Sequence, residues 1–94
     1  MTNKQEFAET VGLQCLAWLV SNEDLLPVFM GATGVSKADI KERAQDPDFL
    51  ASVLDFLMMD DAWVVAFCDA NGLSNETPMR ARAALPGGMQ VEWT

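Results

Sequence analysis

The chain has 94 residues and a formal net charge of -8; half of its residues are apolar, and it contains no histidine and no tyrosine. This length predicts one small domain with a single core. Without histidine, the chain cannot form a Ser-His-Asp or a Cys-His catalytic system. It also cannot form a zinc or haem site that has a histidine ligand. The acidic balance disfavours a general affinity for nucleic acid or for an anionic membrane.

The two cysteines and the polar N-terminus bear on the cellular compartment. Cys15 and Cys68 each lie in an apolar segment without a CxxC motif, so we expect two reduced core side chains. Their spacing alone is also compatible with a disulfide. The N-terminus lacks the basic region and apolar run of a signal peptide, and the longest uncharged stretch, residues 10–22, is too short and too polar for a membrane span. We predict a cytoplasmic protein.

Apolar residues at helical spacing predict a first helix with one buried face. That face comprises Phe7, Val11, Cys15 and Trp18, widened by Ala8, Leu16, Leu19 and Val20. Ser21, with Asp24 three positions later, predicts the N-cap of a second helix that runs to about Thr33. Pro27 either kinks this helix or marks its first turn, and Gly34 suits its C-cap.

The remaining helix starts are predicted from capping residues. Ser36 with Asp39 begins a short third helix that runs through Ala44. Asp46-Pro47 starts a fourth helix, whose expected buried residues are Phe49, Leu50, Val53, Leu54, Phe56 and Leu57.

Two further helices complete the predicted bundle. Asp60-Asp61 precedes a fifth helix, residues 62–70, and Asn71-Gly72 ends it. A sixth helix starts at Ser74 or at Thr77-Pro78 and ends near Leu85, before the stop signal of residues 86–88. Residues 89–94 alternate apolar and polar side chains, and we expect an extended or disordered C-terminal tail.

A shift of 38 positions brings the chain into register with itself. Leu16 then matches Leu54, Phe29 matches Phe67, and the sequence Gly-Val-Ser at 34–36 matches Gly-Leu-Ser at 72–74. The match favours two pseudo-repeated three-helix units that pack around one core, although similar sequence patterns at helix-turn-helix junctions also recur by chance. Two copies are too few for a solenoid.

The segment 25–45 has features of a DNA-binding helix-turn-helix. Gly34 would lie in its turn, Ile40 would be an apolar anchor, and Lys37, Lys41 and Arg43 could contact phosphates. The same cations also suit a helix C-terminus, and residues 35–45 carry three basic but two acidic residues. Nucleic acid is therefore a disfavoured partner.

The acidic pairs of the chain are better explained as helix caps than as metal or acid-base sites. Glu23-Asp24, Asp46 with Asp48, and Asp60-Asp61 each coincide with a predicted helix start. The chain also lacks a calcium-binding loop and a phosphate-binding glycine loop. We predict no enzymatic activity, no catalytic residue, no metal site and no cofactor.

The fifth helix is apolar almost all round, which is typical of a helix at the centre of a core or at an interface. The preceding methionines add to this apolar excess, and methionine-rich patches often mark partner sites. We predict partner binding through Met59, Trp63, Val64 and Phe67.

Several segments together resemble a known family. They are LQCLAWL (13–19), DLLPVF (24–29), TGVS (33–36), DPDFLASVLDFL (46–57) and RARAALPGG (80–88). In this order the chain resembles the small alphaproteobacterial proteins grouped as domain of unknown function 3572, from about Val11 to Gly88. The resemblance implies a compact, all-helical, cytoplasmic protein and transfers no catalytic residue.

These observations predict an all-α bundle of about six helices in a single domain, residues 1–88, followed by the tail. The predicted function is a non-enzymatic protein-protein interaction or regulatory module that binds another protein or itself, for example as a homodimer, and not a membrane. The alternative is a DNA-binding regulator that uses the segment 25–45.

Overall fold

The protein consists of helices joined by short turns within residues 4–85, the part of the chain that the computed structural model describes. No strand occurs within this part, which confirms the predicted all-α class; the predicted tail, residues 89–94, lies outside it. The helices are α1 (Lys4–Val20), α2 (Leu26–Thr33), α3 (Lys37–Arg43), α4 (Pro47–Leu57), α5 (Asp61–Asn71) and α6 (Thr77–Ala83).

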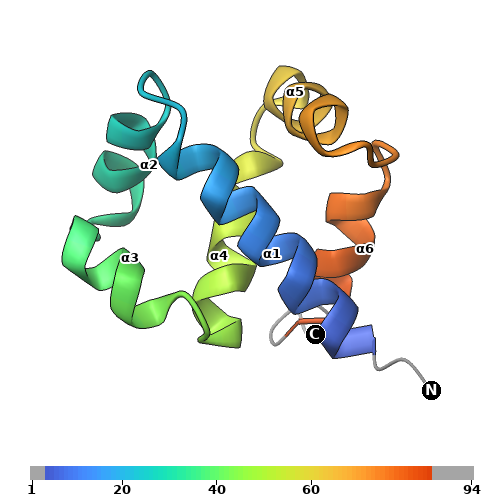
Figure 1. The fold of residues 1–94 in the computed structure, drawn as a ribbon, viewed down its shortest axis with the longest axis horizontal. Coiled ribbons are helices and arrows are strands. Elements are labelled where there is room, and N and C mark those ends of the chain that lie inside the picture. Colours follow the sequence, from blue (N-terminus) through green and yellow to red (C-terminus); the bar gives the residue numbers. More distant parts are fainter. Residues whose placement is uncertain (1–3, 86–94) are drawn as a thin grey trace, which may run out of the picture.

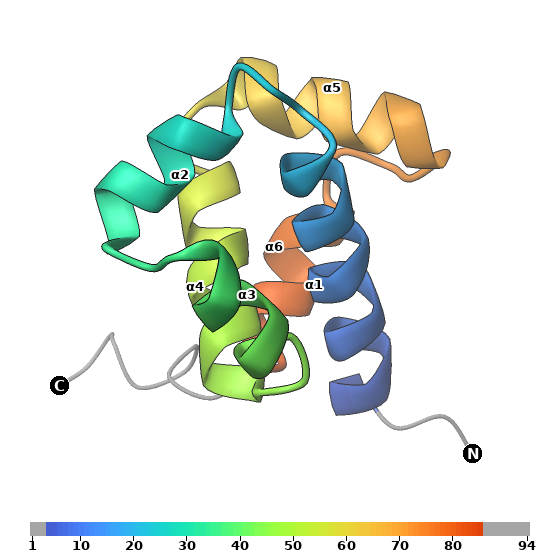
Figure 2. The same ribbon diagram turned by 60° about the vertical axis from the view of Figure 1, so that its left-hand side comes forward.

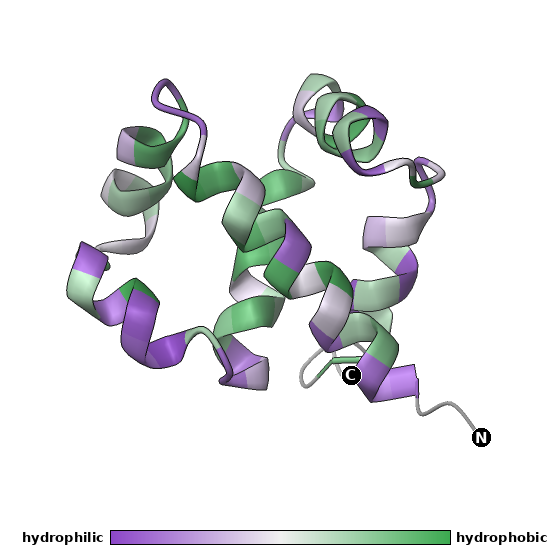
Figure 3. Cartoon of the chain, viewed as in Figure 1, coloured by the Kyte–Doolittle hydropathy of each residue, from purple (hydrophilic) through white to green (hydrophobic). Residues whose placement is uncertain are grey.

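Helices α1 and α4 cross at the centre of the molecule (Figure 1). The pair α2 and α3 lies on one side of this crossing, and the pair α5 and α6 lies on the other. Figure 2 shows α6 between α1 and α4, and it packs against both. Helix α3 makes fewer contacts with its neighbours, and it is largely hydrophilic (Figure 3).

The buried face of α1 includes Gly12 and leaves out three residues that the sequence pattern predicted to belong to it. Phe7 is 40% exposed, Val20 is also exposed, and Trp18 is half-buried. The face follows the helices that pack on α1: α6 packs along it, and α4 approaches it closely at Gly12, where an added Cβ atom would lie 2.9 Å from Leu50 Cβ. The face is centred on this contact, and its members recur every three or four residues: Ala8, Val11, Gly12, Cys15, Leu16 and Leu19.

Helix α4 buries every residue that its sequence pattern predicted. It is strongly amphipathic, because its polar residues Asp48, Ser52 and Asp55 recur at helical spacing on one side. Its buried residues are Phe49, Leu50, Ala51, Val53, Leu54, Phe56 and Leu57.

Local hydrogen bonds confirm three of the predicted helix starts. The Ser36 hydroxyl accepts from the Asp39 amide at 3.1 Å, and the Asp39 carboxylate accepts from the Ser36 amide at 3.0 Å, forming a capping box. The carboxylates of Asp46 and Asp60 accept amide hydrogen bonds at the starts of α4 and α5. The predicted cap at Ser21 is wrong, because the Asn22 side chain accepts the amide hydrogen bonds of that turn.

The two glycines that end helices have the left-handed conformation that the sequence predicted. Gly34 has φ 77° after α2, and Gly72 has φ 67° after α5. The two glycines are 38 positions apart, so the internal repeat holds for the backbone conformation as well as for the sequence. The agreement is specific, since residues other than glycine rarely adopt this φ.

Aromatic contacts relate the two repeats by a pseudo-twofold exchange. Phe29 packs edge-to-face on Phe56, with ring centroids 5.2 Å apart and an interplanar angle of 70°. Adding 38 to the first number and subtracting 38 from the second gives the pair Phe67 and Trp18, which pack at 5.9 Å and 67°. The second helix of each repeat therefore packs on the first helix of the other repeat.

Candidate functional site

Helix α5 lies at the edge of the molecule and not at its centre (Figure 1). Among its predicted partner-binding residues, Phe67 is fully buried against Trp18. Phe67 therefore belongs to the core and cannot line an exposed surface. The sequence carries no signal for this, because the helix is apolar almost all round (Figure 3) and the helices that pack on it decide which face is covered.

The other three predicted residues reach the surface to different degrees. Trp63 is half-buried and stacks on Phe56, with ring centroids 4.9 Å apart and an interplanar angle of 24°. Val64 is also half-buried, and Met59 is 74% exposed in the turn between α4 and α5. The structure thus leaves Met59 and parts of Trp63 and Val64 available to a partner.

Val64 lies on the wall of a surface groove of about 310 Å³ between the start of α5 and the start of α6. We call it the methionine groove. Sequence reasoning missed Met79, which is 60% exposed on α6, because the helices that form the groove are joined by a turn and nothing in their separate patterns brings them together. The lining residues are Met58, Asp61, Val64, Asn75, Glu76, Pro78 and Met79.

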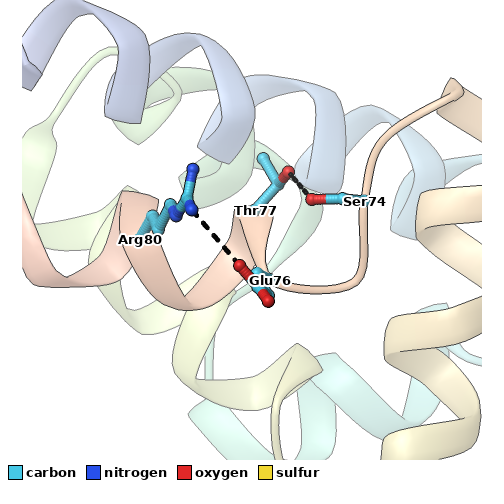
Figure 4. A network of polar contacts seen from close by, with 4 residues as sticks. All are labelled: Ser74, Glu76, Thr77 and Arg80. Atoms are coloured by element: carbon cyan, nitrogen blue, oxygen red, sulfur yellow. Dashed lines mark hydrogen bonds and ion pairs between the residues drawn. The ribbon is translucent and has the colours of Figure 1, made fainter.

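The edge of the methionine groove is acidic. Asp61 and Glu76 contribute carboxylates, and Arg80 Nη2 lies 3.2 Å from Glu76 Oε1, as Figure 4 shows. Both partners of this ion pair are largely exposed, so water and salt screen it. The hydroxyls of Ser74 and Thr77 form a 3.0 Å hydrogen bond in the adjoining turn, which fixes the start of α6.

The predicted basic patch divides over two faces of α3. Lys37 and Lys41 are about 40° apart around the helix axis, whereas Arg43 lies about 200° beyond Lys41. The pKa of the Asp39 carboxyl is lowered by its hydrogen bonds with the backbone and side chain of Ser36, and the positive charge of Arg43 adds to this shift. The charge of Arg43 therefore stabilises the Asp39 carboxylate of the capping box, while Lys37 and Lys41 lie on another face of α3.

Lys37 and Lys41 line a second groove, at the end of α1 and along α2 and α3. It consists of two adjoining hollows of about 400 and 620 Å³ that share Val20, Leu26 and Lys37. We call it the lysine groove. Its complete lining is Val20, Glu23, Leu26, Pro27, Met30, Lys37, Ala38, Ile40 and Lys41.

The cysteines are both free and buried, as predicted. Burial raises the pKa of the Cys15 thiol to about 12, and the neighbouring Cys68 adds to the shift. Burial also raises the pKa of Cys68, with a contribution from Asp69. A nucleophilic cysteine needs a lowered pKa and access to substrate, so these thiols act as apolar core residues.

The described residues contain no buried polar or charged side chain and no cluster of three or more potential metal ligands. Within the same range, no helix is long and apolar enough to cross a membrane. The surface of this part of the chain has two apolar grooves, one with an acidic edge and one with two lysines, and a further hollow of about 410 Å³ between α1 and α6.

Comparison with known proteins gives the family. No curated protein and no solved structure matches the chain. A family model described as "Protein of unknown function (DUF3572)" matches residues 5–88, which include all six helices apart from Lys4. The resemblance of the sequence segments is thereby confirmed, and the chain belongs to the DUF3572 family.

Proposed function

We propose that this protein is a non-enzymatic interaction module of the cytoplasm, which binds another protein through the methionine groove and the adjacent Met59. The observation that carries the proposal is the exposure of Met59 (74%) and Met79 (60%), the highest among the large apolar side chains of residues 4–85. Leaving two such side chains in water forgoes hydrophobic stabilisation that a partner would recover.

The chemistry of the groove indicates what kind of segment it would accept. Methionine side chains are flexible and polarisable, so they adapt to apolar partners of different shape. The carboxylates of Asp61 and Glu76 would favour a segment that also carries a lysine or arginine, although Arg80 offsets part of the charge of Glu76. The expected partner segment is therefore apolar with a basic flank.

The absence of enzymatic activity is part of the same proposal. The pKa shifts of Cys15 and Cys68 have burial as their main cause, and the shift of Asp39 comes from the capping box. Each shifted group thus has a structural role, whereas catalytic acids and bases are tuned for a reaction in a cleft. This supports a binding role over a catalytic one.

DNA binding by the segment 25–45 has weaker support. Ile40 is buried, as an anchor would be, but α3 has only two turns. Arg43 faces away from Lys41, so one duplex face would meet few cations, whereas affinity for DNA rests on many phosphate contacts. The geometry of this segment therefore favours protein binding over DNA recognition.

The proposal is tested by removing the exposed methionines without disturbing the fold. The variant Met59→Ser/Met79→Ser removes apolar surface at the groove wall (Met79) and in the turn before α5 (Met59), and the control Val28→Ser removes an apolar side chain on α2 that is 48% exposed. Affinity purification with quantitative mass spectrometry should recover the same specific partner with wild type and Val28→Ser. Recovery with the double variant should fall at least about tenfold, because burying each methionine is worth roughly 1.5–3 kcal/mol.

A second copy of the chain is the other occupant that this experiment detects. Sedimentation of the same three proteins shows whether wild type self-associates and whether the double variant abolishes it, which would identify the partner as a homodimer subunit. Equal partner recovery with all three proteins would contradict the proposed site. A wild-type protein that stays monomeric and recovers no specific partner would contradict the proposed function.

A further inference from the structure

The two grooves occupy equivalent positions in the two repeats. Adding 38 to Val20 and Leu26 of the lysine groove gives Met58 and Val64, which line the methionine groove. The same shift converts Ile40, which is buried on α3, into Pro78, which is buried on α6. The apolar floor of one groove thus corresponds, residue by residue, to the apolar floor of the other.

The edges of the grooves correspond in position but differ in charge. Lys37 matches Asn75, and Lys41 matches Met79. Ala38 matches Glu76, and Glu23 matches Asp61, so both grooves carry a carboxylate at this last position. The charge difference therefore lies at the other three positions, which hold two lysines in one groove and one glutamate in the other.

Lys37 and Lys41 stand out within an acidic molecule. The ion pairs of residues 4–85 join Arg80 to Glu76 and Arg82 to Asp55, and neither lysine takes part in one. Glu23 lines the same groove but forms no ion pair with Lys37. In a chain with net charge -8, two lysines without an ion pair beside an apolar floor form a local positive site that an incoming carboxylate would complement.

We propose that the lysine groove is a second docking site, which binds an apolar, acidic segment of a partner protein. The protein is then a two-site adaptor whose equivalent grooves select segments of opposite charge. The second docking site is carried by a different surface and by different residues, whereas the two-site adaptor also rests on the proposed function of the methionine groove.

A protein segment fits this groove better than nucleic acid does. Its floor is apolar, with Val20, Leu26 and Ile40 contributing aliphatic side chains, and a phosphate backbone gains nothing from such contacts. Two lysines in a molecule of net charge -8 neutralise far fewer phosphates than the six to ten that strong duplex binding involves. Apolar side chains of a helix or strand would instead cover the floor, while Asp or Glu residues at its edge meet the lysines.

The test uses two designed amphipathic peptides with the same leucine stripe, one with a glutamate polar face and one with a lysine polar face. Amide chemical shifts of the isotope-labelled protein report where each peptide binds. The Glu peptide should shift amides of Val20, Leu26 and Ile40, and the Lys peptide should shift amides near Val64 and Met79. The Lys-peptide arm tests the methionine groove separately, so failures of the two sites are distinguishable.

Charge reversal then isolates the role of the two lysines. The variant Lys37→Glu/Lys41→Glu should weaken binding of the Glu peptide about tenfold, because two attractive contacts become repulsive. Lys4→Glu is the matched control: it reverses one charge at the start of α1, outside the lysine groove, and should leave the affinity within about twofold. Circular dichroism of each variant verifies that the helices are intact.

Four results would overturn the inference. In the first, the Glu peptide binds the double variant as tightly as it binds wild type. In the second, it shifts no amide of the groove. In the third, duplex DNA binds wild type through these lysines while the Glu peptide does not bind. In the fourth, wild type alone forms a dimer that the double variant abolishes, which would make a second copy of the chain the occupant.

Discussion

At the scale of single residues, the buried thiols couple the stability of the fold to alkaline pH. The pKa of Cys15 is raised from 9.0 to about 12, and the pKa of Cys68 is raised as well. Both side chains are fully buried, so ionisation would place a thiolate in the core. The chain has no tyrosine, so phenol groups do not titrate in the same range.

We predict that the free energy of unfolding is unaffected by the Cys15 thiol below pH 9 and falls above it. Between pH 9 and 12 the unfolded chain loses the proton while the folded chain retains it, so rising pH favours unfolding by up to about 1.4 kcal/mol per pH unit for this thiol. Urea denaturation from pH 7 to about pH 11 should show a shallower decline for Cys15→Ala than for wild type. Equal slopes would mean that Cys15 does not carry the effect.

Residues that act within one turn of helix were predictable, and residues whose role depends on a distant helix were not. The capping box of Ser36 and Asp39 needs only a spacing of three, which the sequence displays directly. Phe67 was assigned to a surface, because its burial depends on Trp18, far away in the chain. Met79 was missed because the methionine groove forms only when α5 and α6 fold against each other.

At the scale of helices, the α1–α4 crossing depends on the absence of a side chain at Gly12. An added Cβ would lie 2.9 Å from Leu50 Cβ, an atom held by the backbone of α4 and unable to swing aside. Gly31, on α2, has no atom within 4 Å of the equivalent position. Comparing alanine variants at Gly12 and Gly31 therefore distinguishes the effect of helix propensity from the effect of helix packing.

We predict opposite effects for alanine at these two positions. Gly12→Ala should lower the free energy of unfolding by about 1–2 kcal/mol, because forcing the helices apart outweighs the gain in helix propensity. Gly31→Ala should raise it by up to about 1 kcal/mol, because only the propensity gain applies. Thermal unfolding followed by circular dichroism measures both, and a stabilised Gly12→Ala protein would show that the crossing tolerates a wider separation.

Helix order was predictable from the sequence, whereas the face of α1 was not fully so. Caps and prolines mark each boundary locally, and the observed start at Leu26 places Pro27 in the first turn of α2. The buried face of α1 includes Gly12, a residue without the apolar signal on which hydrophobic periodicity depends. Phe7 was expected in the core for this reason and is partly exposed.

At the scale of the whole molecule, the internal repeat explains why a short chain can form a single core. Gly12 of α1 meets Leu50 of α4, and these positions are 38 apart, so the central crossing pairs a residue with its own counterpart. Such a contact lies on the pseudo-twofold axis that relates the repeats. The register was visible in the sequence, but the exchange of aromatic contacts across the axis was not, because it is a property of the assembled core.

We predict that the two repeats unfold as one unit. Phe29 packs on Phe56 of the other repeat, and Phe67 packs on Trp18 of the other repeat, so neither repeat retains its core alone. Phe29→Leu and Phe67→Leu should each lower the free energy of unfolding by about 1–2 kcal/mol. In both variants, helix content and tryptophan fluorescence should change at the same urea concentration. If instead Phe29→Leu moved one of two separate transitions and left the other in place, the repeats would be independent folding units that share no cooperative core.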